Sequence, residues 1–405
     1  MNQASAAEVR PSWLTQRRLR AHGLILALCL WSAYAVNMST PGLRDRAGLI
    51  KGTDFLHFYT LGTLALTGRG DLLYNISAQT ELVGKQIPEA AGTIYVPLYG
   101  PQVSLLFAPL AKLPYGSALA AWLLLNTLIY ASCCYALWRI CPNLRDHAAI
   151  VAILALAFPG FFHLIAWGQT SGLALACFTL AYLAFRKKYR WLAGAAIGCL
   201  IFKPQLGIAA AVVFIGAAEW KVVVGAITAA AVQLAAAWLH YGSSIMQNYA
   251  RALRHLREVM PLLEPRPYQM HSLRAFWSLL LPWHDVAFGA YLMTAAAVLA
   301  LAVSSWRRQA SLEIRFSVLS LATVLVSPHL TVYDLVVLAP VFLFVTDRIL
   351  EPSSQPLRWL PALLYACYPL FLLGPLAQFT HLQFSVIAMA TLLWLSASER
   401  GSLRT

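Results

Sequence analysis

Charged side chains are scarce in this sequence, since Asp, Glu, Lys and Arg make up only 11% of its 405 residues while hydrophobic residues make up 60%. A soluble globular chain carries roughly 25% charged residues. Helices that cross a bilayer exclude charge almost completely and need about 20 apolar residues in succession. The composition therefore excludes an ordinary soluble protein. It predicts an all-α, polytopic transmembrane helical bundle that forms a single domain over residues 1–405.

Several chemical motifs are also missing. The seven cysteines lie in or beside apolar runs and have no CxxC spacing, so they indicate neither a zinc site nor a disulfide framework. The sequence contains no P-loop, no GxGxxG before a soluble helix, no HExxH and no GxSxG. ATP or a nucleotide sugar is therefore not expected as the direct substrate.

Positive charge is present in excess, with 30 Lys and Arg against 16 Asp and Glu and a net charge of +14. In a membrane protein such an excess is typical of cytoplasmic turns, which hold the topology against anionic lipid. The bilayer therefore accounts for the basic charge, and we expect no nucleic-acid partner.

The apolar runs predict about twelve spans. They lie near residues 21–36, 117–138, 148–165, 170–186, 191–202, 204–219, 222–240, 285–306, 312–326, 331–347, 359–374 and 379–396. When the N-terminus is placed inside, the basic residues between these runs fall at inner turns, as the positive-inside rule requires. This assignment predicts a multi-pass protein of the plasma (inner) membrane with both termini in the cytoplasm.

Two long outer loops follow from this topology, at about residues 37–115 and 241–284, and we expect short interfacial helices within them. The segment VSLLFAPLAKLP in the first loop is too short and too interrupted by proline to cross a bilayer with confidence. It is interpreted as a re-entrant or interfacial segment. Because long loops and polar turns share the outer face, we expect the active site on the periplasmic or extracytoplasmic side.

Asp54, in KGTDFLHFY, is the sharpest catalytic candidate. Thr53 or Asp54 is expected to cap a short helix that continues to about Leu66. Neighbouring aromatic residues, including Tyr59, can desolvate the carboxylate and raise its basicity. A capping role alone carries about equal weight. His57, one turn further on, could contact Asp54 or be an ordinary interfacial histidine.

Basic residues in the second loop suggest a phosphate site. Arg251, Arg254 and Arg257 recur at a spacing of three and therefore lie roughly along one side of a helix. Guanidinium groups bind phosphate through paired hydrogen bonds. A solvated or headgroup-facing basic surface is an equally weighted alternative. His271 and Arg274, further along, extend the cationic region.

Three further polar residues interrupt apolar segments. Lys203, in IFKPQLG, is either a functional residue within the membrane or a lysine that reaches for lipid headgroups. His329, in SPHLTVYD, can donate to a phosphate oxygen or orient a carboxylate. A contact of Asp334 with a histidine or with the backbone is equally open. Gln169 follows Gly168 at an outer turn.

Six motifs follow one another in the order GTDFLHFYTLGTLALTGRGDLLY, YVPLYGPQVSLLFAPLAKLP, AWGQTSGLALAC, FKPQLG, HSLRAF and SPHLTVYDLVVLAP. In this order, from about residue 20 to 345, the chain resembles glycosyltransferase family 87. That family is a branch of the GT-C membrane glycosyltransferases and includes polyprenol-phosphate-mannose-dependent α-mannosyltransferases. The family's first-loop aspartate matches Asp54, its Lys-Pro element matches residues 203–204, and its Ser-Pro-His element matches residues 327–329. The sequence departs from the family at residues 95–97 (Tyr-Val-Pro for Tyr-Pro-Pro), at residues 169–171 (Gln-Thr-Ser for Gln-x-Asn), and at His271.

The resemblance implies an inverting hexosyltransferase of GT-C type. It would move mannose or another hexose or pentose from a polyprenyl-phosphate donor to a lipid-linked or glycan acceptor at the outer face. Asp54 would deprotonate the acceptor hydroxyl. The candidates for binding substrate and neutralising the departing phosphate are His57, Tyr59, Gln169, Lys203, Arg251, Arg254, Arg257, His271 and His329. No cofactor or metal is expected, although a transient Mg²⁺ stays open.

Two other functions stay open at this point. A lipid or solute transporter with an outer gate would need inverted-repeat symmetry, which the spacing of the apolar runs does not display. An oligosaccharide polymerase or ligase would share the outer arginines but would use an undecaprenyl-diphosphate glycan. The sugar, the acceptor and the oligomeric state are not specified by the sequence.

Overall fold

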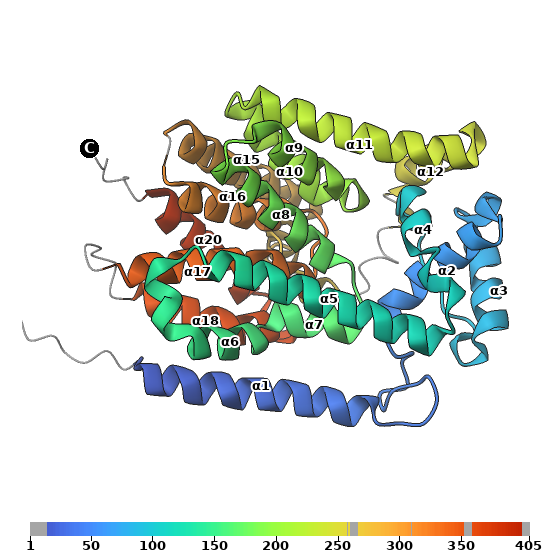
Figure 1. Cartoon of the computed structure of the whole chain (residues 1–405), viewed down its shortest axis with the longest axis horizontal. Coiled ribbons are helices and arrows are strands. Elements are labelled where there is room, and N and C mark those ends of the chain that lie inside the picture. Colours follow the sequence, from blue (N-terminus) through green and yellow to red (C-terminus); the bar gives the residue numbers. More distant parts are fainter. Residues whose placement is uncertain (1–13, 257, 260–265, 309, 352–358, 399–405) are drawn as a thin grey trace, which may run out of the picture.

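The protein is all-helical, as the composition predicts (Figure 1). The computed structural model describes residues 14–256, 258–259, 266–308, 310–351 and 359–398. Within these ranges there is no β-strand, and only two isolated bridges occur, between Arg44 and Ile50 and between Met270 and Thr331. The organisation as a single domain stays a prediction.

Four described helices are long and apolar enough to cross a membrane unaided. They are α1 (Gln16–Met38), α5 (Tyr115–Trp138), α11 (Trp220–Tyr241) and α15 (His284–Arg307). At 1.5 Å per residue each of them is about 33 Å long or longer. That length exceeds the roughly 30 Å of hydrocarbon in a bilayer.

Two bent helix pairs also have the length and composition of a span. The first joins η4 (Pro142–His147) and α6 (Ala148–Leu156) to α7 (Pro159–Trp167) with a bend of 45°. The second joins α18 (Leu360–Leu372) to η8 (Gly374–Leu376) and α19 (Ala377–Thr380) with a bend of 71°. A proline at the start of α7 and another inside η8 account for the breaks. Among the described residues there are thus four to six candidate spans, and the twelve predicted spans are not confirmed.

The remaining apolar runs form helices that are too short to qualify as spans by themselves. These are α8 (Ser171–Arg186), α9 (Arg190–Gly198) with η5 (Cys199–Phe202), α10 (Pro204–Gly216), α16 (Leu312–Val326), η7 (Val332–Leu338) with α17 (Ala339–Ile349), and α20 (Phe384–Ser398). An apolar run in the sequence is not by itself a span, because a break such as Lys203-Pro204 leaves on either side an apolar helix that is too short to cross a bilayer.

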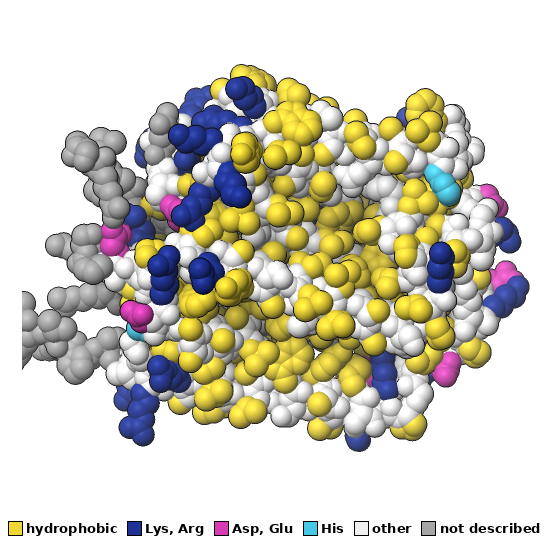
Figure 2. Space-filling model, viewed as in Figure 1, with side chains coloured by type: hydrophobic (Ala, Val, Ile, Leu, Met, Phe, Trp, Pro, Cys, Tyr) yellow, Lys and Arg dark blue, Asp and Glu magenta, His cyan; other side chains and the backbone are white. Residues whose placement is uncertain are grey.

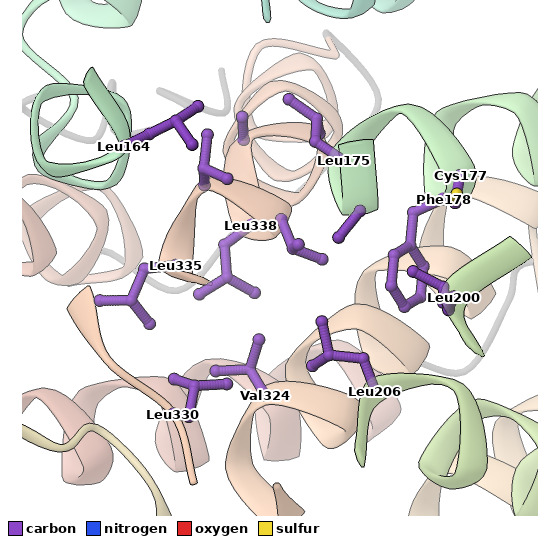
Figure 3. Close-up of a cluster of buried hydrophobic side chains, with 14 of the residues drawn as sticks. Leu164, Leu175, Cys177, Phe178, Leu200, Leu206, Val324, Leu330, Leu335 and Leu338 are labelled. Atoms are coloured by element: carbon purple, nitrogen blue, oxygen red, sulfur yellow. The ribbon is translucent and has the colours of Figure 1, made fainter. Parts of the chain in front are cut away.

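These shorter helices form the centre of the hydrophobic core. Four different helices contribute buried side chains to one cluster (Figure 3). These are Leu175 of α8, Leu206 of α10, Val324 of α16 and Leu335 of η7. The start of α8 and the end of α16 lie inside the protein rather than at its surface, as does Lys203 directly before α10. Polar side chains at these helix ends are therefore brought into the interior, where they must find partners.

The two long loops contain short helices, as expected. In the first loop these are α2 (Thr53–Leu66), η1 (Gly70–Leu72), α3 (Ile76–Gln86), η2 (Pro88–Ala90), α4 (Gln102–Phe107) and η3 (Leu110–Lys112). In the second they are α12 (Ser243–Arg254), η6 (Pro267–Gln269) and α14 (Leu273–Leu280). The segment VSLLFAPLAKLP forms only α4 and η3, which pack on α2 and are too short to cross a bilayer.

The two ends of the bundle differ in charge. Lys and Arg side chains gather at the end where α1 begins and α20 ends, while the middle of this face is largely hydrophobic (Figure 2). Two contacts join turns there: Arg190 Nη1 lies 2.5 Å from Glu219 Oε2, and Arg307 Nε donates to Gly216 O at 2.8 Å. We call this the basic end. The opposite end, with α2, α3, α4 and α12, is called the loop end (Figure 1).

Candidate active site

Asp54 lies in the first turn of α2, but it does not cap that helix. The N-cap is Gly52, in a left-handed conformation and without a side-chain hydrogen bond, and α2 begins at Thr53. Thr53 Oγ1 donates to Ile50 O at 2.8 Å. The expected cap from Thr53 or Asp54 is therefore wrong, whereas the expected helix end at Leu66 is confirmed. A capping role alone no longer accounts for Asp54.

The Asp54 carboxylate is instead bound by a distant glutamine. Gln169 Nε2 donates to Asp54 Oδ2 at 2.8 Å. The Gln169 Oε1 atom accepts from Thr170 N at 2.9 Å, and this bond sets which end of the amide faces the carboxylate, because only the Nε2 side can donate. Gln169 is 5% exposed, so the contact is shielded from water.

Gly168 lets the chain place Gln169 at this point. It ends α7 with φ of 67°, which is the left-handed region that favours glycine. A Cβ atom at Gly168 would lie 2.8 Å from the Cβ of Phe55, next to Asp54. Trp122 Nε1 donates to Gly168 O at 2.8 Å and so holds the turn against α5. The turn between α7 and α8 can therefore approach α2 closely.

The environment of Asp54 makes it a better base than an ordinary carboxylate. Burial raises the pKa of Asp54 from 3.8 to about 6, although the Gln169 hydrogen bond and the positive charges of Lys203 and His329 act to lower it. The side chain is nevertheless partly exposed. A carboxylate with a pKa near 6 is ionised at neutral pH and binds a proton more strongly than a solvated one, which suits a general base.

Lys203 is buried in an ion pair rather than extended toward lipid headgroups. Its Nζ atom lies 2.5 Å from Asp334 Oδ1, and the two side chains are 4% and 3% exposed. Ser171 Oγ, at the start of α8, accepts from Lys203 at 2.9 Å and donates to Asp334 Oδ1 at 2.7 Å. The three residues join α8, α10 and η7 at the inner ends of short helices. The interpretation of Lys203 as a headgroup-seeking lysine is wrong.

Asp334 also contacts the backbone, which was one of the two contacts left open by the sequence. Thr331 N donates to Asp334 Oδ2 at 3.3 Å, and the pair forms a capping box at the start of η7. Lys203 Nζ lies 5.1 Å from the centre of the Tyr333 ring. Burial raises the pKa of Tyr333, and the charges of Asp54 and Asp334 raise it further. Tyr333 is therefore close to both carboxylates.

His329 and Arg274 bring positive charge to the same region. His329 is half-buried in the turn before η7, and its charge lowers the pKa of Asp54. Arg274 Nη1 donates to Pro328 O at 3.2 Å. His271 N donates to Leu330 O at 2.9 Å. The start of α14 thus holds the Ser-Pro-His turn in place and sets Arg274 beside it.

The side chain of His271 points elsewhere. Its Nδ1 atom lies 2.7 Å from Ser385 Oγ of α20, and its ring lies against Gly374. Burial lowers the pKa of His271 to about 3, and His163 lowers it further, so the ring is neutral and adds nothing to the cationic region. The structure therefore does not bring this ring to the Asp54 carboxylate.

His57 is buried rather than interfacial. Its ring centre lies 4.9 Å from that of Tyr95 and 5.7 Å from that of Tyr99. Burial lowers the pKa of His57 to about 4, and neither ring nitrogen has a hydrogen-bond partner among the described residues. Tyr59 faces another way, since its hydroxyl donates to Leu113 O at 2.9 Å and ties α2 to the end of η3.

Tyr99 belongs to the site but was not among the residues singled out from the sequence. Burial raises its pKa, and the charge of Asp54 raises it further. Nearby, the Tyr95 hydroxyl donates to Thr53 O, directly before Asp54. The signal that points to these residues is the motif YVPLYGP, whose prolines prevent a regular helix and so leave the two tyrosines to pack onto α2.

The predicted arginines lie apart from this cluster. Arg251 and Arg254 are exposed on α12 at the loop end, and Arg257 lies outside the described residues (Figure 1). The α12 helix follows α11 directly. The hydroxyl of Tyr241, at the end of α11, lies 2.6 Å from Ser104 Oγ of α4. No contact found within the described ranges joins Arg251 or Arg254 to Asp54.

No three His, Cys, Asp or Glu side chains gather at a common point in the part of the chain that the structure describes. The nearest acidic neighbour of Asp54 is Asp334, and its carboxylate is already paired with Lys203. The expectation that the reaction needs no metal stays a prediction.

Comparison with known proteins supplies one match. A family model, that of glycosyltransferase family 87, matches residues 98–328, which is more than half of the chain. The match includes Gln169 and Lys203 and ends at Pro328, while Asp54 precedes it. No curated protein and no solved structure matches the chain.

Proposed function

The chain belongs to glycosyltransferase family 87, and on that basis we propose that it is an inverting glycosyltransferase of GT-C type. The donor is a polyprenyl-phosphate sugar, with mannose or another hexose or pentose as the transferred group. The acceptor is a lipid-linked or glycan hydroxyl. Because the chain is a multi-pass membrane protein, a donor anchored in the bilayer reaches the site without leaving the membrane.

One observation carries this proposal, namely the Asp54 carboxylate with its pKa raised to about 6 by burial and its partly exposed side chain. Asp54 accepts the proton of the acceptor hydroxyl. The acceptor oxygen then forms a bond to the anomeric carbon, while the bond from that carbon to the phosphate oxygen breaks on the opposite face. The polyprenyl phosphate leaves with the electron pair, so the configuration inverts. Gln169 holds the carboxylate in its ionised form through the hydrogen bond at 2.8 Å.

The leaving phosphate requires positive charge as its own negative charge increases. His329, in the turn before η7, and Arg274, which donates to Pro328 O of the same turn, are our candidates for contacting it. The charge of Lys203 is compensated by Asp334 at 2.5 Å, so we assign Lys203 the role of holding the site together. Arg251 and Arg254 of α12, with Arg257 further along the chain, attract the donor headgroup.

The orientation in the membrane follows from the positive-inside rule. The basic end then faces the cytoplasm of the plasma (inner) membrane, with both termini on that side. The loop end, which carries α2 and α12, faces the periplasmic or extracytoplasmic side. Asp54 lies on α2 and therefore serves substrates presented in the outer leaflet.

The proposal is tested with purified protein, a panel of radiolabelled polyprenyl-phosphate sugars, and a lipid extract as the source of acceptors. We expect label in a product of higher mass with one donor, and none with Asp54→Asn. Labelled donor that crosses a proteoliposome without forming a glycosidic bond would instead indicate a transporter. Absence of product with every donor from well-folded protein would contradict the proposal.

A further inference from the structure

A cavity lies between α1 and the rest of the bundle, away from Asp54. Its volume is about 640 Å³, within the range of roughly 300–1,000 Å³ that small-molecule sites occupy. Its walls come from α1, α6, α17 and α18, and they are mostly hydrophobic, with Leu26, Val151 and Phe342 among the lining residues. Figure 1 shows α1 at the edge of the bundle beside α6, so this cavity lies next to the surrounding lipid.

The cavity has the depth of one bilayer leaflet. Along α1 it extends from Gln16 to Cys29, a rise of about 20 Å at 1.5 Å per residue. A bilayer with its headgroups is about 40–45 Å thick, so this length matches half of it. Gln16 begins α1 at the basic end of the bundle (Figure 1). A molecule that fills the cavity therefore has one terminus at the basic end and the other near the bilayer centre.

Positive charge surrounds the mouth of the cavity. Arg18 and Arg20 are exposed on the first turns of α1, and each lies one turn from a lining residue, His22 and Gln16 respectively. Arg145 is exposed in η4, two residues before His147, which lines the opposite wall. The neighbouring Asp146 is the acidic residue of η4, and the basic groups outnumber it. An anionic group is therefore favoured at the mouth.

The interior carries a polar pair in a mostly apolar wall. His22 Nδ1 of α1 lies 2.8 Å from the hydroxyl of Tyr365 in α18, and both residues line the cavity. This bond joins α1 to the bundle about two turns below the mouth. An ester group of a lipid that enters from the basic end would reach this depth, while its acyl chain would continue along Leu26.

We propose that this cavity binds an anionic phospholipid of the leaflet at the basic end. Its phosphate lies against Arg18, Arg20 and Arg145, and an acyl chain lies between α1 and α6. The lipid is distinct from the sugar donor, whose phosphate belongs at the loop end. Because α1 is otherwise exposed along Leu24 and Leu28, the bound lipid stabilises the packing of α1 on the bundle, as any ligand that binds only the folded state does.

Native mass spectrometry of the delipidated protein tests this, with phosphatidylglycerol and phosphatidylcholine of the same chain length added separately. We expect one retained phosphatidylglycerol, and a rise in the thermal unfolding midpoint with that lipid alone. Leu26→Trp fills the cavity and removes both effects. Leu28→Trp, on the outer side of α1, retains them and controls for a bulky residue on the same helix.

A second pair of variants tests the charge at the mouth. Arg18→Gln with Arg20→Gln weakens phosphatidylglycerol binding by roughly fivefold for each arginine removed. The matched control Lys187→Gln with Lys221→Gln removes two exposed basic residues, one at the end of α8 and one in α11, neither of which lines the cavity, and leaves binding unchanged. Equal retention of both lipids, or unchanged retention in Leu26→Trp, would overturn the proposal. A dimer that Leu26→Trp abolishes would assign the cavity to a second copy of the chain and also overturn it.

Discussion

Gln169 Nε2 and Asp54 Oδ2 are joined by a hydrogen bond of 2.8 Å, although 115 residues separate them in the sequence. The bond connects α2 in the first long loop to the turn between α7 and α8 in the bundle. Gln169 lies inside the segment that matches the family and Asp54 lies outside it. This contact therefore extends the candidate site beyond the matched segment.

The first prediction concerns the pH dependence of transfer. As a base, Asp54 must be ionised, so kcat/KM falls as the pH decreases through about 6. Gln169→Leu removes a hydrogen bond that favours the ionised form, and the acidic limb should move to higher pH by roughly one unit. Rates measured between about pH 5 and 8 check this. Gln233→Leu, which removes a glutamine bonded to Ala229 O, should leave the limb in place, and an unmoved limb in Gln169→Leu would count against the assignment.

A second prediction concerns the packing of α2. A Cβ atom at Gly62 would lie 2.5 Å from Phe107 O, a backbone atom of α4, whereas one at Gly116 in α5 meets nothing within 4 Å. Gly62→Ala should therefore separate α2 from α4 and lower both thermal stability and transfer. Gly116→Ala should leave stability unchanged or raise it by about 0.5–1 kcal/mol. Equal unfolding midpoints for the two variants would contradict the close packing.

Removal of Lys203 provides a third prediction, on stability. Lys203→Met leaves Asp334 as an unpaired buried charge and should cost about 3–5 kcal/mol in the free energy of unfolding. The double variant Lys203→Met with Asp334→Leu should recover most of that loss. Arg190→Gln, which breaks the more exposed pair with Glu219, should cost no more than about 1 kcal/mol. A small effect of Lys203→Met, measured by denaturant unfolding in detergent, would show that the buried pair does not hold the site together.

The fourth prediction separates the two sets of cations. His329→Gln should lower kcat, because His329 lies in the turn before η7, where its charge acts on Asp54, and is assigned to the leaving phosphate. Arg251→Gln with Arg254→Gln on exposed α12 should instead raise KM for the lipid donor, with an effect that weakens at high salt. Steady-state kinetics at two ionic strengths distinguish these outcomes. The reverse pattern would place the phosphate near α12.

The all-helical fold and the helix from about residue 53 to 66 could be predicted from the sequence, because both depend on local composition and spacing. The pairing of Asp54 with Gln169 could not, because it depends on the close approach at Gly168. The ion pair between Lys203 and Asp334 could not be predicted either, because it too joins residues that are far apart in the sequence. The twelve spans expected from hydropathy are not confirmed, since α8, α10 and α16 are each shorter than the roughly 20 residues that a crossing requires.

The electrostatic surroundings of the candidate residues were equally hidden. Histidine in a loop suggests positive charge, yet burial keeps His57 and His271 neutral. Tyr99 and Tyr333 lie in the motifs YVPLYGP and SPHLTVYD, but only their packing brings them near Asp54. Long-range packing decides which polar side chains meet in a helical bundle. These contacts cannot be predicted from a single sequence.

The central claim is that Asp54 is the general base, and Asp54→Asn tests it most directly. General-base catalysis contributes about 10²–10⁴-fold to a rate, so we expect kcat to fall by at least about 100-fold while the Kd of the lipid donor is unchanged. Asp71→Asn, an exposed aspartate of the same loop, should retain activity.

Misfolding would not account for such a loss. Because the pKa of Asp54 is raised in the folded state, its ionised form costs stability as the pH rises through about 6. The asparagine variant should therefore unfold at the same temperature as wild type at pH 8, or at a higher one. The decisive measurement is single-turnover transfer of radiolabelled sugar by Asp54→Asn with donor bound. The account predicts almost no product, and product formed at the wild-type rate would contradict it.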